Sequence, residues 1–162
     1  MQWPPRFRFA VSQQQLSKQQ RLNVASSPDH RRSSGFLRRL FGDRGENAAA
    51  KFLKRKGCRI LARQYETRWG ELDLICLDGE CIVFVEVKTR RSAATTQPGE
   101  SVDRRKQLHL TKAAFFWLKQ NQLLEHKARF DIVTVVWPDD AKQPTIEHFE
   151  NAFEAADFGQ MF

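Results

Sequence analysis

Cysteine and long apolar runs are scarce in this chain, and both absences narrow the class of protein. Its 162 residues include three cysteines, an odd number without the spacing of a disulfide framework, which indicates reduced thiols in the cytosol. The four histidines are scattered without zinc-ligand spacing. No run approaches the roughly 18 apolar residues of a membrane span, and no apolar segment marks a secretory signal. We therefore expect a cytoplasmic protein that has no membrane partner.

Acidic residues are almost missing from the first 42 positions, where Asp29 stands against eight lysines and arginines. This stretch is rich in Gln, Ser and Arg, which predicts that residues 1–41 are a disordered, basic N-terminal tail. Its arginines are expected to add non-specific attraction to nucleic acid, although the same composition is typical of an organelle transit peptide. From residue 43 onward nineteen basic residues stand against eighteen acidic ones. The net charge of +8 therefore belongs mostly to the tail.

The chain does have a dense alternation of apolar and charged residues between Gly70 and Thr89. Side chains alternate between the two faces of a strand, and Asp78-Gly79 tolerates a tight turn, so this stretch predicts a β-hairpin. With that turn, Asp73 and Glu86 are diagonal neighbours on one face, with Cα atoms roughly 7–8 Å apart. The opposite face is entirely apolar and carries Leu72, Leu74, Cys76, Cys81, Val83, Val85 and Val87.

Two carboxylates and Lys88 thus gather at one end of an otherwise apolar hairpin. Carboxylates at this spacing raise each other's pKa unless a cation lies between them. Lys88 supplies one positive charge, and a divalent ion such as Mg²⁺, which takes one or two carboxylates and keeps waters for a phosphate, would supply the rest. The alternative is a surface ion pair of Lys88 with Asp73 or Glu86, which contributes little. We favour the metal site, because Glu-x-Lys ends an apolar strand beside a second acid.

The remaining chain predicts helices and strands on either side of the hairpin. Their order is helix, strand, hairpin, helix and strand, which predicts an α/β fold with a mixed central sheet flanked by helices. The first helix is expected from Asp43 to Lys56 and is ended by Gly57. Within it, Glu46 either closes a capping box with Asp43 or points from the buried stripe toward the hairpin acids. The other expected elements are a strand over 58–62, a loop over 90–100, a helix over 101–124, a strand over 130–137 and a short strand over 146–149.

The hairpin motif resembles the PD-(D/E)xK nuclease core of the restriction-endonuclease-like superfamily. The resemblance is carried by Gly70–Ile75 followed by Phe84–Arg90. More narrowly, the chain is similar to the YraN-like family of uncharacterised bacterial proteins, which are themselves similar to Holliday-junction resolvases and tRNA-endonuclease-like domains. The similarity extends from about Gly42 to about Phe153, and its other markers are Gly45-Glu46, Arg129-Phe130-Asp131 and Asn151-Ala152-Phe153. It implies a restriction-endonuclease-like domain over residues 42–157, followed by a frayed C-terminus over residues 158–162.

The resemblance also implies an activity. It is that of a metal-dependent endonuclease that hydrolyses phosphodiester bonds, with DNA expected ahead of RNA, in recombination or repair. RNA processing is the alternative, because tRNA-endonuclease-like domains share the fold. Asp73, Glu86 and the backbone carbonyl of Val87 would bind Mg²⁺ or Mn²⁺, with Glu46 as a third acid, and Lys88 would orient the nucleophile. Junction-cleaving relatives act as symmetric dimers, so a homodimer is a further expectation. The family commonly has Asn at the position of Gln64.

A second group of residues is expected to contact nucleic acid around this site. Arg68 beside Trp69 interleaves a cation with an aromatic ring, although such a pair can equally be a strand edge with its stem packed on the ring. The others are Arg90 and Arg91 at the root of a loop, and Lys106 and Gln107 at a helix start. The alternative function is a nuclease fold that binds nucleic acid, or assembles with a partner, without turnover.

Overall fold

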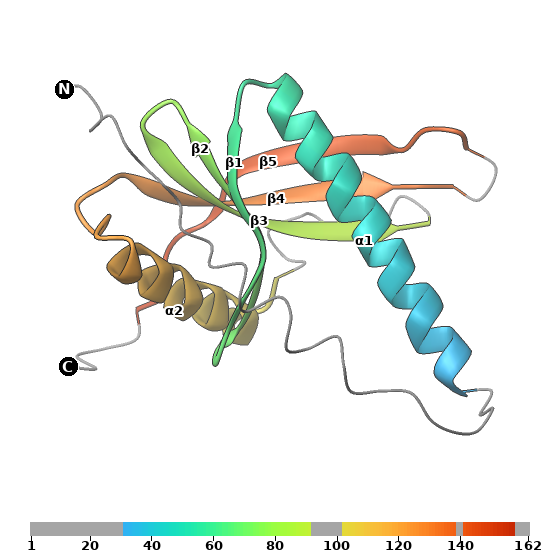
Figure 1. Cartoon of the computed structure of the whole chain (residues 1–162), viewed down its shortest axis with the longest axis horizontal. Helices are drawn as coiled ribbons and strands as arrows, with labels where there is room; N and C mark the ends of the chain where they lie inside the picture. The colour runs from blue at the N-terminus through green and yellow to red at the C-terminus, as the bar shows by residue number, and fades with distance from the viewer. Residues whose placement is uncertain (1–30, 92–101, 139–140, 158–162) are drawn as a thin grey trace, which may run out of the picture. The chain divides into compact units, whose positions relative to one another are not determined.

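The computed structural model describes residues 31–91, 102–138 and 141–157, which form two helices and five strands. The strands build one mixed sheet in the order β1-β2-β3-β4-β5. Only the β3–β4 pair is parallel, and α2 lies between these two strands in the sequence. This confirms the expected α/β fold with a mixed sheet. The elements (Figure 1) are α1 (Arg31–Arg55), β1 (Arg59–Thr67), β2 (Gly70–Asp78), β3 (Cys81–Arg90), α2 (Arg104–Gln120), β4 (Ala128–Val136) and β5 (Thr145–Phe153).

Each face of the sheet packs against one helix. On one face Ala49, Ala50 and Leu53 of α1 meet alternate strand residues, namely Leu74, Cys76, Val83, Val85, Val133 and Val135. On the other face the buried residues of α2 meet Ile75, Ile82, Phe84, Phe130 and Ile132. The expected division of the hairpin into two faces is therefore confirmed for these residues, because alternate side chains of one strand cannot share a face. Leu72 differs, since it packs with the α2 cluster.

The predicted hairpin register was wrong by two residues. Leu77 pairs with Ile82 and Ile75 with Phe84, so the turn residues are Gly79 and Glu80 rather than Asp78 and Gly79. Gly79 has φ of +57°, a left-handed conformation that glycine adopts at no steric cost. A shift of two residues leaves every side chain on its predicted face, because the strand period is two. The shift does change the relation of the two acids. Leu74 pairs with Val85, so the next residues, Asp73 and Glu86, lie directly opposite each other rather than diagonally.

Helix α1 begins at Arg31 and not at the predicted Asp43. Residues 31–41 were predicted to be disordered, which was wrong because they are helical, and this segment contains good helix formers and no proline. Asp43 therefore lies inside the helix and cannot be its N-cap. The predicted helix end is confirmed: Gly57 has φ of +96°, and the N–H of Cys58 donates to the carbonyl of Leu53 at 3.0 Å.

Other element bounds differ from the prediction by several residues. Strand β1 runs on to Thr67, beyond the expected end at residue 62, and β5 continues to Phe153, beyond the expected end at residue 149. Helix α2 is shorter than predicted and begins after Asp103, whose side chain accepts a hydrogen bond from the N–H of Lys106. The loop expected over 90–100 was wrong at its start, because Arg90 is the last residue of β3. Residues 92–100 of that loop, the expected disorder of residues 1–30 and the expected fraying of 158–162 lie outside the described residues. Neither described helix is long and apolar enough to span a membrane.

Candidate active site

Strands β2 and β3 bring Asp73 and Glu86 together at one end of the hairpin. They occupy the strand positions next to the paired residues Leu74 and Val85. Asp73 Oδ2 accepts a hydrogen bond from the N–H of Val87 at 2.7 Å, which ties the two strands at this point. The prediction that both acids share one end of one face agrees with this pairing.

Glu86 is buried, with 5% of its surface exposed, and its two oxygens have different surroundings. Oε1 lies 2.8 Å from Lys88 Nζ and 3.2 Å from Lys106 Nζ, so β3 and α2 each direct an ammonium group at it. Oε2 is buried and has no hydrogen-bond partner among the described residues. Native proteins rarely leave a buried polar atom unpaired, because its desolvation is not compensated. Glu86 therefore has one saturated oxygen and one that is available to a ligand.

Asp73 shares this environment, and its pKa is raised to about 7. Burial is the largest cause, and the negative charges of Glu86 and then Glu46 add to it. The N–H of Val87 and the ammonium of Lys106 oppose the rise without cancelling it. In the absence of another cation, Asp73 thus takes up a proton near neutral pH.

Glu46 approaches these acids from α1, because α1 passes unusually close to the end of β3. A Cβ atom on Gly45 would lie 1.8 Å from Thr89 Oγ1, so only glycine fits at this crossing. Burial, and next the charge of Glu71, raise the pKa of Glu46. Because Asp43 is inside the helix, the capping-box interpretation of Glu46 is wrong, and the half-buried position facing the other acids remains.

Gln64 is a member of this neighbourhood that sequence reasoning did not identify as such. Its neighbours in β1 pair with Leu74 and Leu72, so Gln64 lies opposite Asp73. Its side chain hydrogen-bonds Glu46, which opposes the rise in the pKa of that acid, and its Nε2 lies 3.3 Å from Asp43 Oδ1. Gln64 also has φ of +47°, a left-handed conformation that Asn adopts more readily than Gln. The tendency of the resembling family to carry Asn here is a signal that could have indicated this backbone geometry.

The donor set of Asp73 and Glu86 fits a hard divalent cation. Two adjacent carboxylates with a free buried oxygen are suited to Mg²⁺ or Mn²⁺, which keep several waters when few protein ligands are present. Within the described ranges no three His, Cys, Asp or Glu side chains gather as a metal-ligand group. Glu46 therefore does not join the other two acids as a third ligand in this structure. Coordination by the carbonyl of Val87 stays a prediction.

The five residues expected to contact nucleic acid have different positions. Lys106 reaches the acid pair through Glu86. Gln107 instead donates from Nε2 to the carbonyl of Val102 at 2.9 Å, which holds the start of α2. Arg68 stacks on Trp69, with its guanidinium carbon 4.2 Å from the ring centroid. Arg90 ends β3, and the Arg91 guanidinium lies 5.6 Å from the Phe41 ring centroid.

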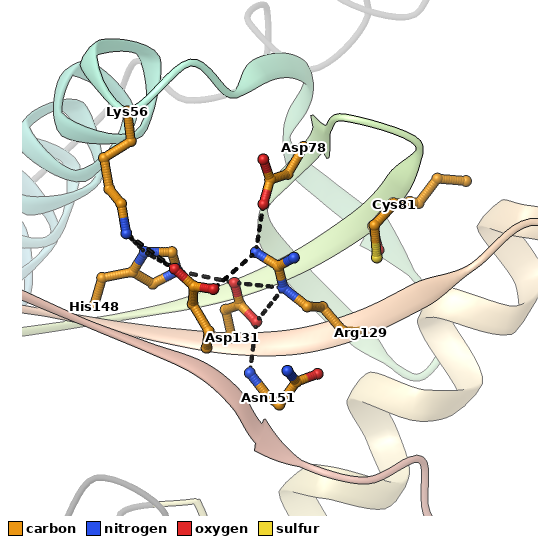
Figure 2. A network of polar contacts seen from close by, with 9 residues as sticks. Lys56, Asp78, Cys81, Arg129, Asp131, His148 and Asn151 are labelled. Carbon is orange, nitrogen blue, oxygen red and sulfur yellow. Dashed lines mark hydrogen bonds and ion pairs between the residues drawn. The ribbon is translucent and has the colours of Figure 1, made fainter.

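A second polar cluster surrounds Asp131 of β4 (Figure 2). Asp131 is fully buried and accepts hydrogen bonds from Arg129 Nε at 3.0 Å and from the N–H of Asn151 at 3.0 Å, while His148 Nε2 lies 2.8 Å from its other oxygen. Burial raises the pKa of Asp131, but these hydrogen bonds outweigh it and the net pKa is lowered. Arg129 also reaches Asp78 at 2.8 Å. Arg129 is thus the ion-pair partner of the buried Asp131.

This cluster gives a physical reason for Asn151, the first residue of the marker Asn151-Ala152-Phe153. Strand β5 has a bulge opposite Asp131, where Asn151 adopts φ of +51° and turns its N–H to the carboxylate. Asn tolerates this conformation better than most residues. At the outer side, Lys56 contacts both His148 and Glu150 at 3.0 Å and so joins the end of α1 to β5. Every polar group in the cluster has a partner within the protein, which indicates a structural role.

The fold and the acid pair together define an α/β protein with a two-carboxylate, two-lysine site on a β-hairpin. Comparison with known proteins places it more narrowly. The model of the uncharacterised protein family UPF0102 matches residues 45–135, and the chain belongs to this family. This confirms the YraN-like resemblance. The matched range includes Gly45, the hairpin and most of β4, and so contains both acids.

Relatives in several bacteria share most of the described domain. A UPF0102 protein of Trichlorobacter lovleyi is 47% identical over 116 residues, which cover 71% of this chain and 91% of the relative. One from Rhodopirellula baltica is 47% identical over 117 residues, or 70% of each chain. A third, from Geobacter sulfurreducens, is 44% identical over 120 residues, which cover 73% of this chain and 91% of the relative. Their names state the family and no activity.

Proposed function

We propose that this protein is a metal-dependent phosphodiesterase that acts on nucleic acid. The observation that carries the proposal is the adjacent pair Asp73 and Glu86, in which Glu86 is buried and one of its oxygens has no partner among the described residues. A structural salt bridge would leave no oxygen unpaired, whereas a cation-binding site requires one. Asp73 and Glu86 would hold Mg²⁺ or Mn²⁺, and DNA is the preferred substrate.

Other residues around the acid pair have separate roles in the proposed reaction. A bound divalent ion supplies Lewis-acid stabilisation of the reacting phosphate and activates water. The ammonium groups of Lys88 and Lys106 both lie beside Glu86. They can also stabilise the negative charge that develops on the phosphate in the transition state. The N–H of Val87 fixes the orientation of Asp73. Because the pKa of Asp73 is about 7, this carboxyl must lose a proton before it can act as a ligand at neutral pH.

The test combines metal binding with cleavage. Calorimetry would titrate Mg²⁺ and Mn²⁺ into the wild type, into a variant with Asp73→Asn and Glu86→Gln, and into Glu80→Gln as a matched control. Glu80 is an exposed acid at the other end of the same hairpin. A panel of labelled linear, flapped and four-way DNA, with RNA counterparts, would report cleavage. Metal binding and cutting that are lost in the double variant, and kept in Glu80→Gln, support the proposal; retention of both activities in the double variant rejects it.

The second candidate is a nucleic-acid-binding or assembly module without turnover. It is favoured by the two lysines that already neutralise Glu86 Oε1, and by the lack of a three-ligand group within the described ranges. Asp73→Ala separates the two functions. A binding module should hold nucleic acid as tightly or more tightly, because one repulsive charge is removed, whereas an enzyme should lose turnover. A homodimer stays a prediction.

A further inference from the structure

The turn between β1 and β2 carries an arginine stacked on an aromatic ring. The guanidinium carbon of Arg68 lies 4.2 Å from the Trp69 ring centroid, and Trp69 meets the Phe116 ring in an edge-on contact with centroids 5.5 Å apart. Thr67 Oγ1 donates to the carbonyl of Gly70 at 2.8 Å and accepts from the N–H of Trp69 at 3.1 Å. The stack is therefore held by a closed turn on one side and by α2 on the other.

The guanidinium of Arg68 uses only one of its faces, the one over the Trp69 ring, for a contact within the described protein. This side chain is exposed and forms no ion pair within the part of the chain that the structure describes. Arg63 of the same strand differs, because it donates to Asn47 at 2.8 Å. With one face against Trp69, the guanidinium of Arg68 presents its other face to solvent. A planar cation fixed in this way is a surface on which a nucleobase stacks.

The stack lies on the same side of the sheet as the acid pair. Trp69 contacts Phe116 of α2, and the same helix supplies Lys106 to Glu86. Trp69 precedes Asp73 by four residues, so their Cα atoms are at most about 14 Å apart even in a fully extended strand. Neighbouring nucleotides of one strand can therefore reach the stack and the acids together.

We propose that Arg68, Trp69 and Phe116 form a stacking platform for an unpaired nucleobase, so that the acid pair acts on single-stranded or frayed nucleic acid rather than on continuous duplex. This inference rests on the proposed function, since it names the form of its substrate. A base inside a duplex is stacked on both faces, whereas an unpaired base has a free π-face. The positive charge of Arg68 also complements the phosphate of the same nucleotide.

The test measures binding without metal, so that it does not depend on cleavage. Fluorescence anisotropy in EDTA would compare a labelled single-stranded oligonucleotide with a duplex of equal length. The variants are Arg68→Lys, which keeps the charge but loses the plane, Trp69→Ala, and Lys51→Gln as a control that removes an exposed charge on α1. A 2-aminopurine in the single strand would report stacking directly, because stacking quenches its fluorescence.

We expect the wild type to prefer the single strand and to quench the 2-aminopurine. Arg68→Lys and Trp69→Ala should each weaken single-strand binding by about 5- to 100-fold and abolish quenching, while Lys51→Gln should change affinity by less than about threefold. Equal binding of duplex and single strand, or an Arg68→Lys variant that binds and quenches like the wild type, would overturn the platform. Cleavage that persists in that case leaves the phosphodiesterase proposal standing, whereas stacking without any cleavage supports the platform and removes the proposed chemistry.

Discussion

At the scale of single residues, the raised pKa of Asp73 makes the candidate site a source of instability in the metal-free protein. The pKa is about 7 in the folded chain against 3.8 for an ordinary Asp. Between these values the unfolded chain loses its proton while the folded chain keeps it, so the site lowers stability as pH rises from about 4 to about 7. At higher pH the penalty stays constant.

Replacement of Asp73 by Asn removes this penalty and keeps an acceptor for the N–H of Val87. In EDTA at pH 8 we expect Asp73→Asn to raise the free energy of unfolding by about 1–3 kcal/mol. Urea unfolding at several pH values checks this, and the gain should disappear near pH 4, where Asp73 is protonated in both states. A variant that is less stable than the wild type at pH 8 would contradict the assignment of repulsion to this pair.

Gln64 tests a different residue property, the backbone conformation opposite Asp73. Because its φ is +47°, the left-handed conformation destabilises the folded chain by roughly 1–2 kcal/mol with Gln at this position and by less with Asn. We expect Gln64→Asn to raise the midpoint of thermal unfolding slightly and Gln64→Ala to lower it, since Ala also loses the hydrogen bonds to Glu46 and Asp43. If Ala proved as stable as Asn, the conformational argument would fail.

At the scale of elements, the contact between Gly45 and Thr89 sets how closely α1 approaches β3. Gly45→Ala would place a methyl group 1.8 Å from Thr89 Oγ1, so α1 or the strand must shift, at a cost of about 1–3 kcal/mol. Gly42→Ala is the matched control, because a Cβ there has nothing within 4 Å and should stabilise the helix by about 0.5–1 kcal/mol. Chemical unfolding of both variants measures the difference, and equal effects would show that the crossing is not tight.

The cluster around Asp131 joins β4, β5 and the end of α1. Asp131→Ala leaves Arg129, His148 and the N–H of Asn151 without their shared partner and should destabilise the protein by about 3–5 kcal/mol at neutral pH. Because the pKa of Asp131 is lowered on folding, its contribution is present above the ordinary Asp pKa and is lost in acid, so the two proteins should converge there. Glu150→Gln, at the exposed end of the cluster, should cost less than about 1 kcal/mol.

At the scale of the whole molecule, alternation and order along the chain predicted the sheet, the faces of the hairpin and the end of α1. They did not predict the register, because turns at Asp78-Gly79 and Gly79-Glu80 give the same alternation, and only the observed pairing of Asp78 with Cys81 separates them. The left-handed backbone of Gln64 and Asn151 was not predicted, because a positive φ in a residue other than glycine leaves little trace in one sequence. The contact of His148 with Asp131 joins two strands, and a local pattern does not report it.

The acid pair is built from a hairpin of adjacent strands, while Lys106 comes from α2, the next element along the chain. Local contacts form early in folding and crossovers to a parallel strand form late. The two acids therefore meet before the second lysine arrives, and their repulsion falls on the folding transition state. Stopped-flow refolding in EDTA should be faster at pH 5 than at pH 8, and Asp73→Asn should remove most of that difference. The charged site then slows refolding as well as lowering the stability of the native state.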